Sequence, residues 1–115
     1  MQCNVGESMD KLVEMFEMQK DLQRKINGSI GLPMDKQSLF EKQVLGLVCE
    51  LGEVLKADER WKEVRILHVN RLEKLDEIVD CFCFLVNMCL YSGFSSFELY
   101  DAFVEKYKIN VERDM

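Results

Sequence analysis

Hydrophobic residues recur with a helical period at the start of the chain. In residues 8–26 they follow one another at intervals of three and four, which places them on one face of a helix: Leu12, Met15, Phe16, Leu22 and Ile26. Gln19 is the polar member of this stripe. Residues 27–33 hold two Gly and one Pro among small polar residues, and this turn chemistry predicts that the helix ends there.

The same periodicity predicts three further helices, over residues 38–57, 71–91 and 95–112. Two of them carry a start signal. Ser38 with Glu41, and Ser95 with Glu98, have the spacing of a capping box. In a capping box the hydroxyl and the carboxylate each accept a hydrogen bond from a free backbone N–H at the helix start.

The third predicted helix differs from the others because it is apolar on most sides in its second half. We therefore expect it at the centre of the core or in a subunit interface. Gly93 is placed to end it. Residues 58–70, which precede it, mix charged and apolar side chains, and we expect a loop or a short irregular piece there.

Composition agrees with an all-α fold in a single domain. The chain has 115 residues, of which 48% are hydrophobic and 31% charged, as is typical of a globular protein. It has one Pro and six Gly, which is few for an all-β chain. We expect one all-α domain over residues 1–115.

The net charge limits the kind of partner that the chain can bind. Lys and Arg number 15 against 21 Asp and Glu, a net charge of −6, which argues against a nucleic-acid polymer as partner. A nucleotide held through a bridging cation remains compatible with this charge.

The cysteines and the apolar runs bear on where the protein is found. The five Cys form no CxxC pair, so we expect reduced thiols in a cytoplasmic protein. The chain does not open like a signal peptide, and its most apolar run, residues 81–91, is too short to span a membrane.

Two acidic pairs lie in apolar helical sequence. Glu50 and Glu53 are three residues apart, as are Glu77 and Asp80, so each pair projects from one helix face. Burying such charges unpaired is strongly unfavourable. Four carboxylates on two facing helices would suit Mg²⁺ or Mn²⁺. The alternative is that these acids lie on exposed helix edges or pair with Lys and Arg. A di-iron site is disfavoured, because it needs Glu-x-x-His and the only His is His68.

The last predicted helix carries Lys106, Asn110 and Arg113 on one stripe. Positive residues near the end of a helix offset its dipole. Alternatively, they contact a phosphate chain. The sequence leaves both interpretations open.

Four short segments carry a resemblance to a known family. In chain order they are a Gln-bearing helix at residues 16–22, Glu50-x-x-Glu53 with Trp61-Lys62 after it, Glu77-x-x-Asp80, and Lys106-x-x-x-Asn110-x-x-Arg113. This ordered set resembles the motifs of the all-α nucleoside triphosphate pyrophosphatases, which include the MazG-type enzymes and the dimeric dUTPases. The resemblance covers residues 9–113.

The resemblance implies a bundle of four or five helices that forms a homodimer or a dimer of dimers. It implies Mg²⁺ as cofactor, with Mn²⁺ as a possible substitute. The implied reaction is hydrolysis of a nucleoside triphosphate to the monophosphate and pyrophosphate, with dUTP as the leading substrate.

Each motif residue carries an implied role. Glu50, Glu53, Glu77 and Asp80 would bind Mg²⁺, and Glu53 would also orient or deprotonate the attacking water. The residues that the resemblance places around the nucleotide are the base contact Gln19, the sugar or base contact Asn87, the Trp61–Lys62 element, and Lys106, Asn110 and Arg113 on the phosphate side. An equally good interpretation of Asn87 is a buried side chain that is hydrogen-bonded within the bundle.

The chain also departs from the family pattern. It is shorter than typical dimeric dUTPases, and residues 57–62 contain a single aromatic side chain. These departures leave room for a broader MazG-like pyrophosphatase that accepts dCTP or modified nucleotides. A different class also remains open, a non-catalytic helical module that binds nucleotides or dimerises.

Overall fold

The computed structural model describes residues 10–30, 35–62 and 67–114. It contains four α-helices and one short 3-10 helix, which are α2 (Lys11–Ile30), α3 (Lys36–Ala57), η1 (Glu59–Trp61), α4 (Arg71–Ser92) and α5 (Ser96–Asp114). Within these residues the extended chain is limited to one isolated bridge between Asp58 and Val69. The predicted all-α fold is therefore confirmed.

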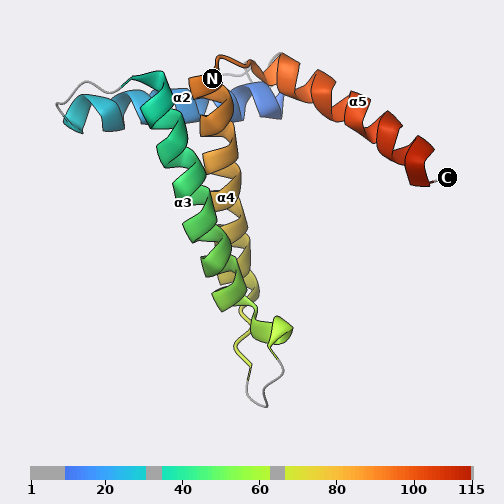
Figure 1. Ribbon diagram of the computed structural model, residues 1–115. Coiled ribbons are helices and arrows are strands. Elements are labelled where there is room, and N and C mark those ends of the chain that lie inside the picture. Colours follow the sequence, from blue (N-terminus) through green and yellow to red (C-terminus); the bar gives the residue numbers. More distant parts are fainter. Residues whose placement is uncertain (1–9, 31–34, 63–66, 115) are drawn as a thin grey trace.

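Helices α3 and α4 form an antiparallel hairpin, which is the main packing unit of the chain (Figure 1). Helix α2 crosses the end of the hairpin where α3 begins and α4 ends. Helix α5 starts at this same end and runs outward, away from the hairpin. The opposite end of the hairpin carries η1.

Helix α2 continues beyond its predicted end. The break predicted from residue 27 is wrong for residues 27–30, which are helical, while residues 31–33 lie outside the described part of the chain. A tertiary contact accounts for the extension. The Asn27 Nδ2 group donates to the Tyr91 hydroxyl at 3.0 Å, and that hydroxyl donates to Gln23 Oε1 at 2.6 Å. These bonds dock the last turns of α2 on α4.

Helix α3 begins earlier than its predicted capping box. Asp35 is the N-cap, and its side chain accepts a hydrogen bond from the Ser38 backbone N–H at 2.7 Å. The Glu41 carboxylate instead accepts from the Gln37 side chain at 2.8 Å. The Ser38–Glu41 box is therefore wrong. A carboxylate at the cap is favoured because its charge also complements the helix dipole.

The remaining helix signals are confirmed. Helix α4 ends at Gly93, whose φ of 82° lies in the left-handed region that glycine adopts readily. Ser95 and Glu98 form the predicted capping box at the start of α5. The Ser95 N–H donates to Glu98 Oε1 at 2.9 Å, and the Glu98 N–H donates to Ser95 Oγ at 3.1 Å.

The tip of the hairpin is held by Asp58. Its carboxylate accepts from Arg60 Nη2 at 2.6 Å and from Lys74 Nζ at 2.8 Å. These two cationic donors, Arg60 first, hold the pKa of Asp58 well below its ordinary value. The described residues of this segment, 58–62 and 67–70, contain only η1 and one isolated bridge. This short irregular structure agrees with the prediction for residues 58–70.

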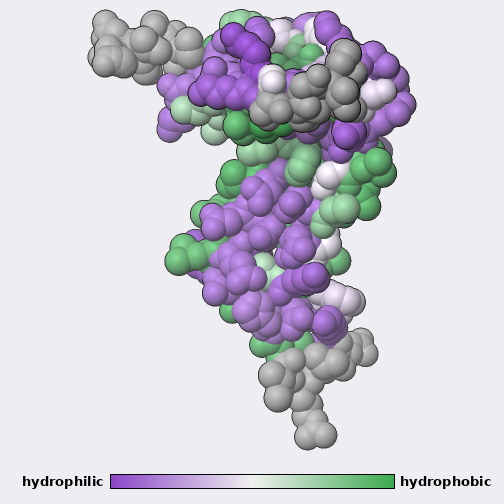
Figure 2. All heavy atoms as spheres, turned by 90° about the vertical axis from the view of Figure 1, so that its left-hand side faces the viewer, coloured by the Kyte–Doolittle hydropathy of each residue, from purple (hydrophilic) through white to green (hydrophobic). Residues whose placement is uncertain are grey.

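The chain buries little of its apolar surface. Among the described residues, the buried hydrophobic side chains are Phe16, Ala57, Cys81 and Val86. The radius of gyration is 17.4 Å, whereas a compact domain of this length has about 13 Å. Hydrophobic residues line both margins of the column formed by the hairpin (Figure 2). The large apolar side chains most exposed on α3, α4 and α5 are Leu45, Val48, Leu72, Phe97, Phe103 and Tyr107.

Among the described residues, no single helix is both long and apolar enough to cross a membrane. Helices α4 and α5 meet the length and composition requirement only as a pair, with a bend of 112° between them.

Candidate active site

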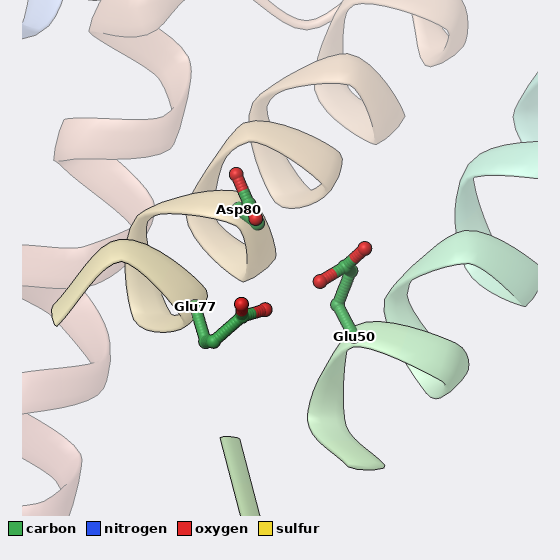
Figure 3. A group of neighbouring side chains, drawn as sticks. All are labelled: Glu50, Glu77 and Asp80. Carbon is green, nitrogen blue, oxygen red and sulfur yellow. The ribbon is translucent and has the colours of Figure 1, made fainter. Parts of the chain in front are cut away.

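Three carboxylates meet between α3 and α4. Glu50 comes from α3, while Glu77 and Asp80 come from α4, and one oxygen of each lies within 4.8 Å of the others. The three side chains point toward one another (Figure 3). The three-residue spacing on α4 puts Glu77 and Asp80 on the face that meets α3. Three of the four acidic residues that the sequence singles out thus lie together, one from α3 and two from α4.

Close approach of the two helices depends on Gly46. A Cβ atom at this position would collide with the Phe84 ring of α4. Gly46 lies one helical turn before Glu50, so the close contact holds the Glu50 end of α3 against α4. The small residue thereby helps to set the separation of the carboxylates.

The carboxylates perturb one another. The pKa of Glu77 is raised above its ordinary value, first by burial, then by a hydrogen bond to Glu50 and by the charges of Glu50, Asp80 and Glu53. Burial, together with the charges of Glu50, Asp80 and Glu77, raises the pKa of the neighbouring Cys81 thiol. Like charges this close are unfavourable without a counter-ion. Their oxygens are hard ligands of the type that Mg²⁺ and Mn²⁺ prefer. The donor set therefore fits a divalent cation.

Glu53 lies outside this group of three. Its side chain is 47% exposed, and Oε1 lies 3.6 Å from Lys56 Nζ. Its charge nonetheless acts on Glu77. The structure thus brings three of the four predicted ligands together and leaves the fourth at the edge of the cluster.

A pocket of about 440 Å³ opens beside the carboxylates. Glu50 and Asp80 form part of its wall, and amide side chains and Phe84 form much of the remainder. Gln19 and Asn87, the two base-side residues expected from the sequence, both line it. Gln19 Nε2 donates to Asn87 Oδ1 at 3.0 Å. Two of the three clustered carboxylates and the amides therefore line one cavity.

Sequence reasoning missed Gln43, a buried polar residue of α3. Its Oε1 accepts a hydrogen bond from Asn87 Nδ2 at 2.9 Å, and it lines the same pocket. A signal was available. Gln43 precedes Glu50 by seven residues, which is two helical turns, and Asn87 follows Asp80 by seven. Each amide therefore lies on the same helix face as its carboxylate.

The Trp61–Lys62 element lies at the far end of the hairpin. Trp61 is 58% exposed, and its Nε1 donates to the Leu55 carbonyl at 3.1 Å. Lys62 Nζ pairs with Glu59 at 2.9 Å and lies 5.5 Å from the centre of the Trp61 ring. Neither residue lines the amide pocket.

The predicted phosphate contacts lie on α5. Lys106, Asn110 and Arg113 are all exposed, and α5 runs away from the hairpin (Figure 1). None of the described residues of α5 lines the amide pocket. Within one chain, these three side chains are not brought to the carboxylates.

The fold and the site together define an all-α protein in which a carboxylate cluster adjoins an amide-lined pocket. A family model described as dUTPase matches residues 11–95. The chain therefore belongs to the dUTPase family of all-α nucleoside triphosphate pyrophosphatases, and this membership indicates a hydrolase acting on nucleotide phosphoanhydrides. The matched range contains the carboxylates and the amides and ends before α5. Comparisons with curated proteins and with solved structures gave no match.

Proposed function

We propose that the protein is a Mg²⁺-dependent pyrophosphohydrolase of the cytoplasm that converts dUTP to dUMP and pyrophosphate. One observation carries the proposal. Glu50 and Asp80 belong both to the carboxylate group and to the wall of the amide-lined pocket. A triphosphate bound at the carboxylate end would place its base at the amide end. Family membership supports the reaction class.

The carboxylates would hold the metal. Glu50, Glu77 and Asp80 offer a preformed set of oxygen ligands, and Glu53 would join them from the edge. A bound Mg²⁺ would polarise phosphoryl oxygens and lower the pKa of a bound water. Glu53 lies outside the group of three carboxylates and its side chain is 47% exposed, so we assign it to orient or deprotonate that water as a general base.

The amides would hold the base. Gln19 and Asn87 already form a hydrogen bond at the pocket wall, and Phe84 supplies apolar surface beside them. A polar edge and an apolar surface are the two contacts that a nucleobase needs. Gln19 would contact the base, while Asn87 would contact the base or the sugar.

A second copy of the chain would supply the remaining groups. The accessible surface is 9026 Å², whereas a compact monomer of this length exposes about 6,500 Å². The excess of about 2,500 Å² is in the range that an obligate homodimer buries on each subunit. We propose a homodimer in which Lys106, Asn110 and Arg113 reach the phosphates of the other subunit's site, with Trp61 and Lys62 closing over the nucleotide.

A substrate panel tests the proposal. The purified protein is incubated with Mg²⁺ and dUTP, dCTP, dTTP, dATP or dGTP, and the products are separated by ion-exchange chromatography. We expect dUMP and pyrophosphate from dUTP, and loss of this activity in Glu53→Gln. Glu41→Gln is the matched control, since Glu41 is an exposed residue of the same helix.

The other outcomes separate the alternatives. Equal turnover of several nucleotides would contradict the dUTP assignment and leave a broader MazG-like pyrophosphatase. Absence of turnover with both Mg²⁺ and Mn²⁺, combined with thermal stabilisation by either metal, would indicate a non-catalytic nucleotide-binding module.

A further inference from the structure

Helix α5 carries an apolar stripe that the described part of the chain leaves uncovered. Ser96 is the only buried residue of this helix, which projects away from the hairpin (Figure 1). The stripe has alternating intervals of three and four residues and consists of Phe97, Tyr100, Val104, Tyr107 and Val111. Its aromatic members are strongly exposed, with Phe97 at 66% and Tyr107 at 63%. This spacing is that of the contact seam between two paired helices.

The family match does not account for this stripe. The residues that match the dUTPase model end at residue 95, whereas α5 begins at Ser96. A contiguous exposed apolar surface on a helix marks a site of interaction with another molecule. The identity of that molecule has to come from the residues beside the stripe.

Two opposite charges lie along one margin of the stripe. Asp101 and Lys108 are seven residues apart, which is two helical turns, so they share one side of α5. Asp101 forms no ion pair with another described residue. Lys108 Nζ lies 3.3 Å from Glu105 Oε1, and these two side chains are 62% and 68% exposed. Such an exposed pair contributes little to stability, so Lys108 can exchange it for another partner.

This margin complements itself when two copies of α5 run antiparallel. The stripes of the two helices interlock when Val104 of each copy faces Tyr107 of the other. Asp101 of each copy then comes opposite Lys108 of the other, within about 3 Å along the helix axis. The contact is the same from both sides, as a two-fold symmetric interface requires.

A parallel pair lacks this match. In parallel paired helices, the margin that carries Asp101 and Lys108 faces the other margin of the second copy. Asp101 would then lie beside Ser96, and Lys108 would lie beside Phe103. Neither of these residues carries a charge, so the two ion pairs are specific to the antiparallel arrangement.

We propose that α5 pairs with α5 of a second copy in antiparallel orientation, through the apolar stripe and two Asp101–Lys108 ion pairs. The inference rests on the proposed function for the existence of a homodimer, and it names the surface that joins the two chains. The chain exposes about 2,500 Å² more than a compact monomer, which is enough to include this contact.

The pairing leaves the charged groups of the last motif at the surface. Lys106 and Arg113 lie about 150° around the helix from the centre of the stripe. Antiparallel pairing also brings the last turns of each α5 to the start of the other. Helix α5 starts at the end of the hairpin that α2 crosses (Figure 1), so Arg113 would approach that end of the second copy.

Two substitutions of apolar residues on α5 test the stripe. The dissociation constant of the dimer is measured by sedimentation equilibrium for the full chain. In Tyr107→Glu we expect it to rise roughly 30-fold or more, as for loss of an interface hot spot. Ile109→Glu is the matched control, because Ile109 is 53% exposed and lies about 160° from the centre of the stripe. It should keep the parental constant.

Reversal of the flanking charges tests the orientation. Asp101→Lys and Lys108→Asp should each raise the dissociation constant roughly tenfold at low salt, because two ion pairs become like-charge contacts. The double variant, Asp101→Lys with Lys108→Asp, should return to the parental value. Circular dichroism verifies that each variant is folded, and if Tyr107→Glu does not fold, the charge reversals decide.

The outcomes separate this inference from the proposed function. A monomeric parent, equal constants for Tyr107→Glu and Ile109→Glu, or a double variant no tighter than the single ones would each overturn the pairing. A dimer that survives Tyr107→Glu would leave the proposed homodimer in place with a different interface. Pairing through α5 in a protein that hydrolyses no nucleotide would uphold the inference and contradict the proposed reaction.

Discussion

Glu77 illustrates how the fold changes the chemistry of a single side chain. It is half-buried, hydrogen-bonded to Glu50, and close to the charges of Asp80 and Glu53. All of these influences favour its protonated form, so its pKa is raised. The folded chain without metal consequently holds a proton that the unfolded chain releases more easily.

The stability of the metal-free protein should therefore depend on pH. The contribution of Glu77 is fully present below the pKa of an unfolded Glu, and it is lost as the pH rises through the raised folded pKa. We expect the free energy of unfolding, measured in urea with EDTA, to fall from mildly acidic to neutral pH. Added Mg²⁺ should restore stability at neutral pH, because it binds the native state.

Glu77→Gln is the informative variant for this effect. It removes the titrating group, so its unfolding free energy should vary less with pH and should exceed that of the parent at neutral pH without metal. Glu112→Gln, an exposed change on α5, should keep the parental curve. A flat curve for the parent, or an equal slope in Glu77→Gln, would contradict the proposed effect of burial.

Residue identity alone could predict the acids but not the whole site. Glu50, Glu77 and Asp80 are informative because charge is rare in apolar helical sequence. Gln43 carries no charge, and a Gln on a helix is ordinary. Only the contact of three helices at Asn87 shows that Gln43 and Gln19 are both hydrogen-bonded to this residue. Tertiary pairing of this kind leaves little trace in local sequence.

At the scale of helices, the existence of each element was predictable and its ends were less so. Gly93 and the Ser95–Glu98 box mark their helix ends by local chemistry, and both predictions are confirmed. The end of α2 depends on Tyr91, 64 residues from Asn27 in the chain. Such a contact overrides the turn preference of residues 27–30, because tertiary bonds outweigh weak local propensities.

The contact between α3 and α4 predicts opposite changes in stability for two glycine substitutions on α3. Gly46→Ala should lower the free energy of unfolding by about 1–3 kcal/mol, because the new methyl group collides with the Phe84 ring. Gly52→Ala is the matched change on the same helix, where nothing lies within 4 Å of an added Cβ. It should instead raise stability by about 0.5–1 kcal/mol through helix propensity.

Urea unfolding followed by circular dichroism measures both glycine variants. The two variants should change the free energy of unfolding in opposite directions. This difference separates the effect of packing against Phe84 from the effect of helix propensity. If Gly46→Ala were as stable as Gly52→Ala, the Phe84 ring would have moved aside at little cost, and Gly46 would not control the separation of the helices.

At the scale of the molecule, the exposed apolar surface and the projecting α5 have the same explanation in the proposed homodimer. Helix α5 runs away from the hairpin that carries the carboxylates, and none of its described residues lines the amide pocket of the same chain. In a symmetric dimer, each α5 could serve the other subunit's site. The proposed arrangement would make activity depend on which chains are paired.

Mixed dimers provide the measurement. Glu53→Gln and Arg113→Ala should each hydrolyse dUTP poorly when pure. After the two are unfolded together and refolded in equal amounts, half of the dimers contain one of each chain, and one of their two sites carries neither change. We expect about a quarter of parental activity. Activity no higher than the mean of the pure variants would contradict the exchange of α5, while light scattering checks the dimer mass.

The position of the only tryptophan has an optical consequence. Trp61 stands at the outer tip of the hairpin with more than half of its surface in water, and the Lys62 ammonium lies near its ring. Its fluorescence in an isolated chain is therefore that of a hydrated indole. Any event that covers the tip, whether pairing of chains or arrival of a nucleotide, shifts this emission to shorter wavelength. The chain thus contains its own reporter of closure, with no other indole to obscure the signal.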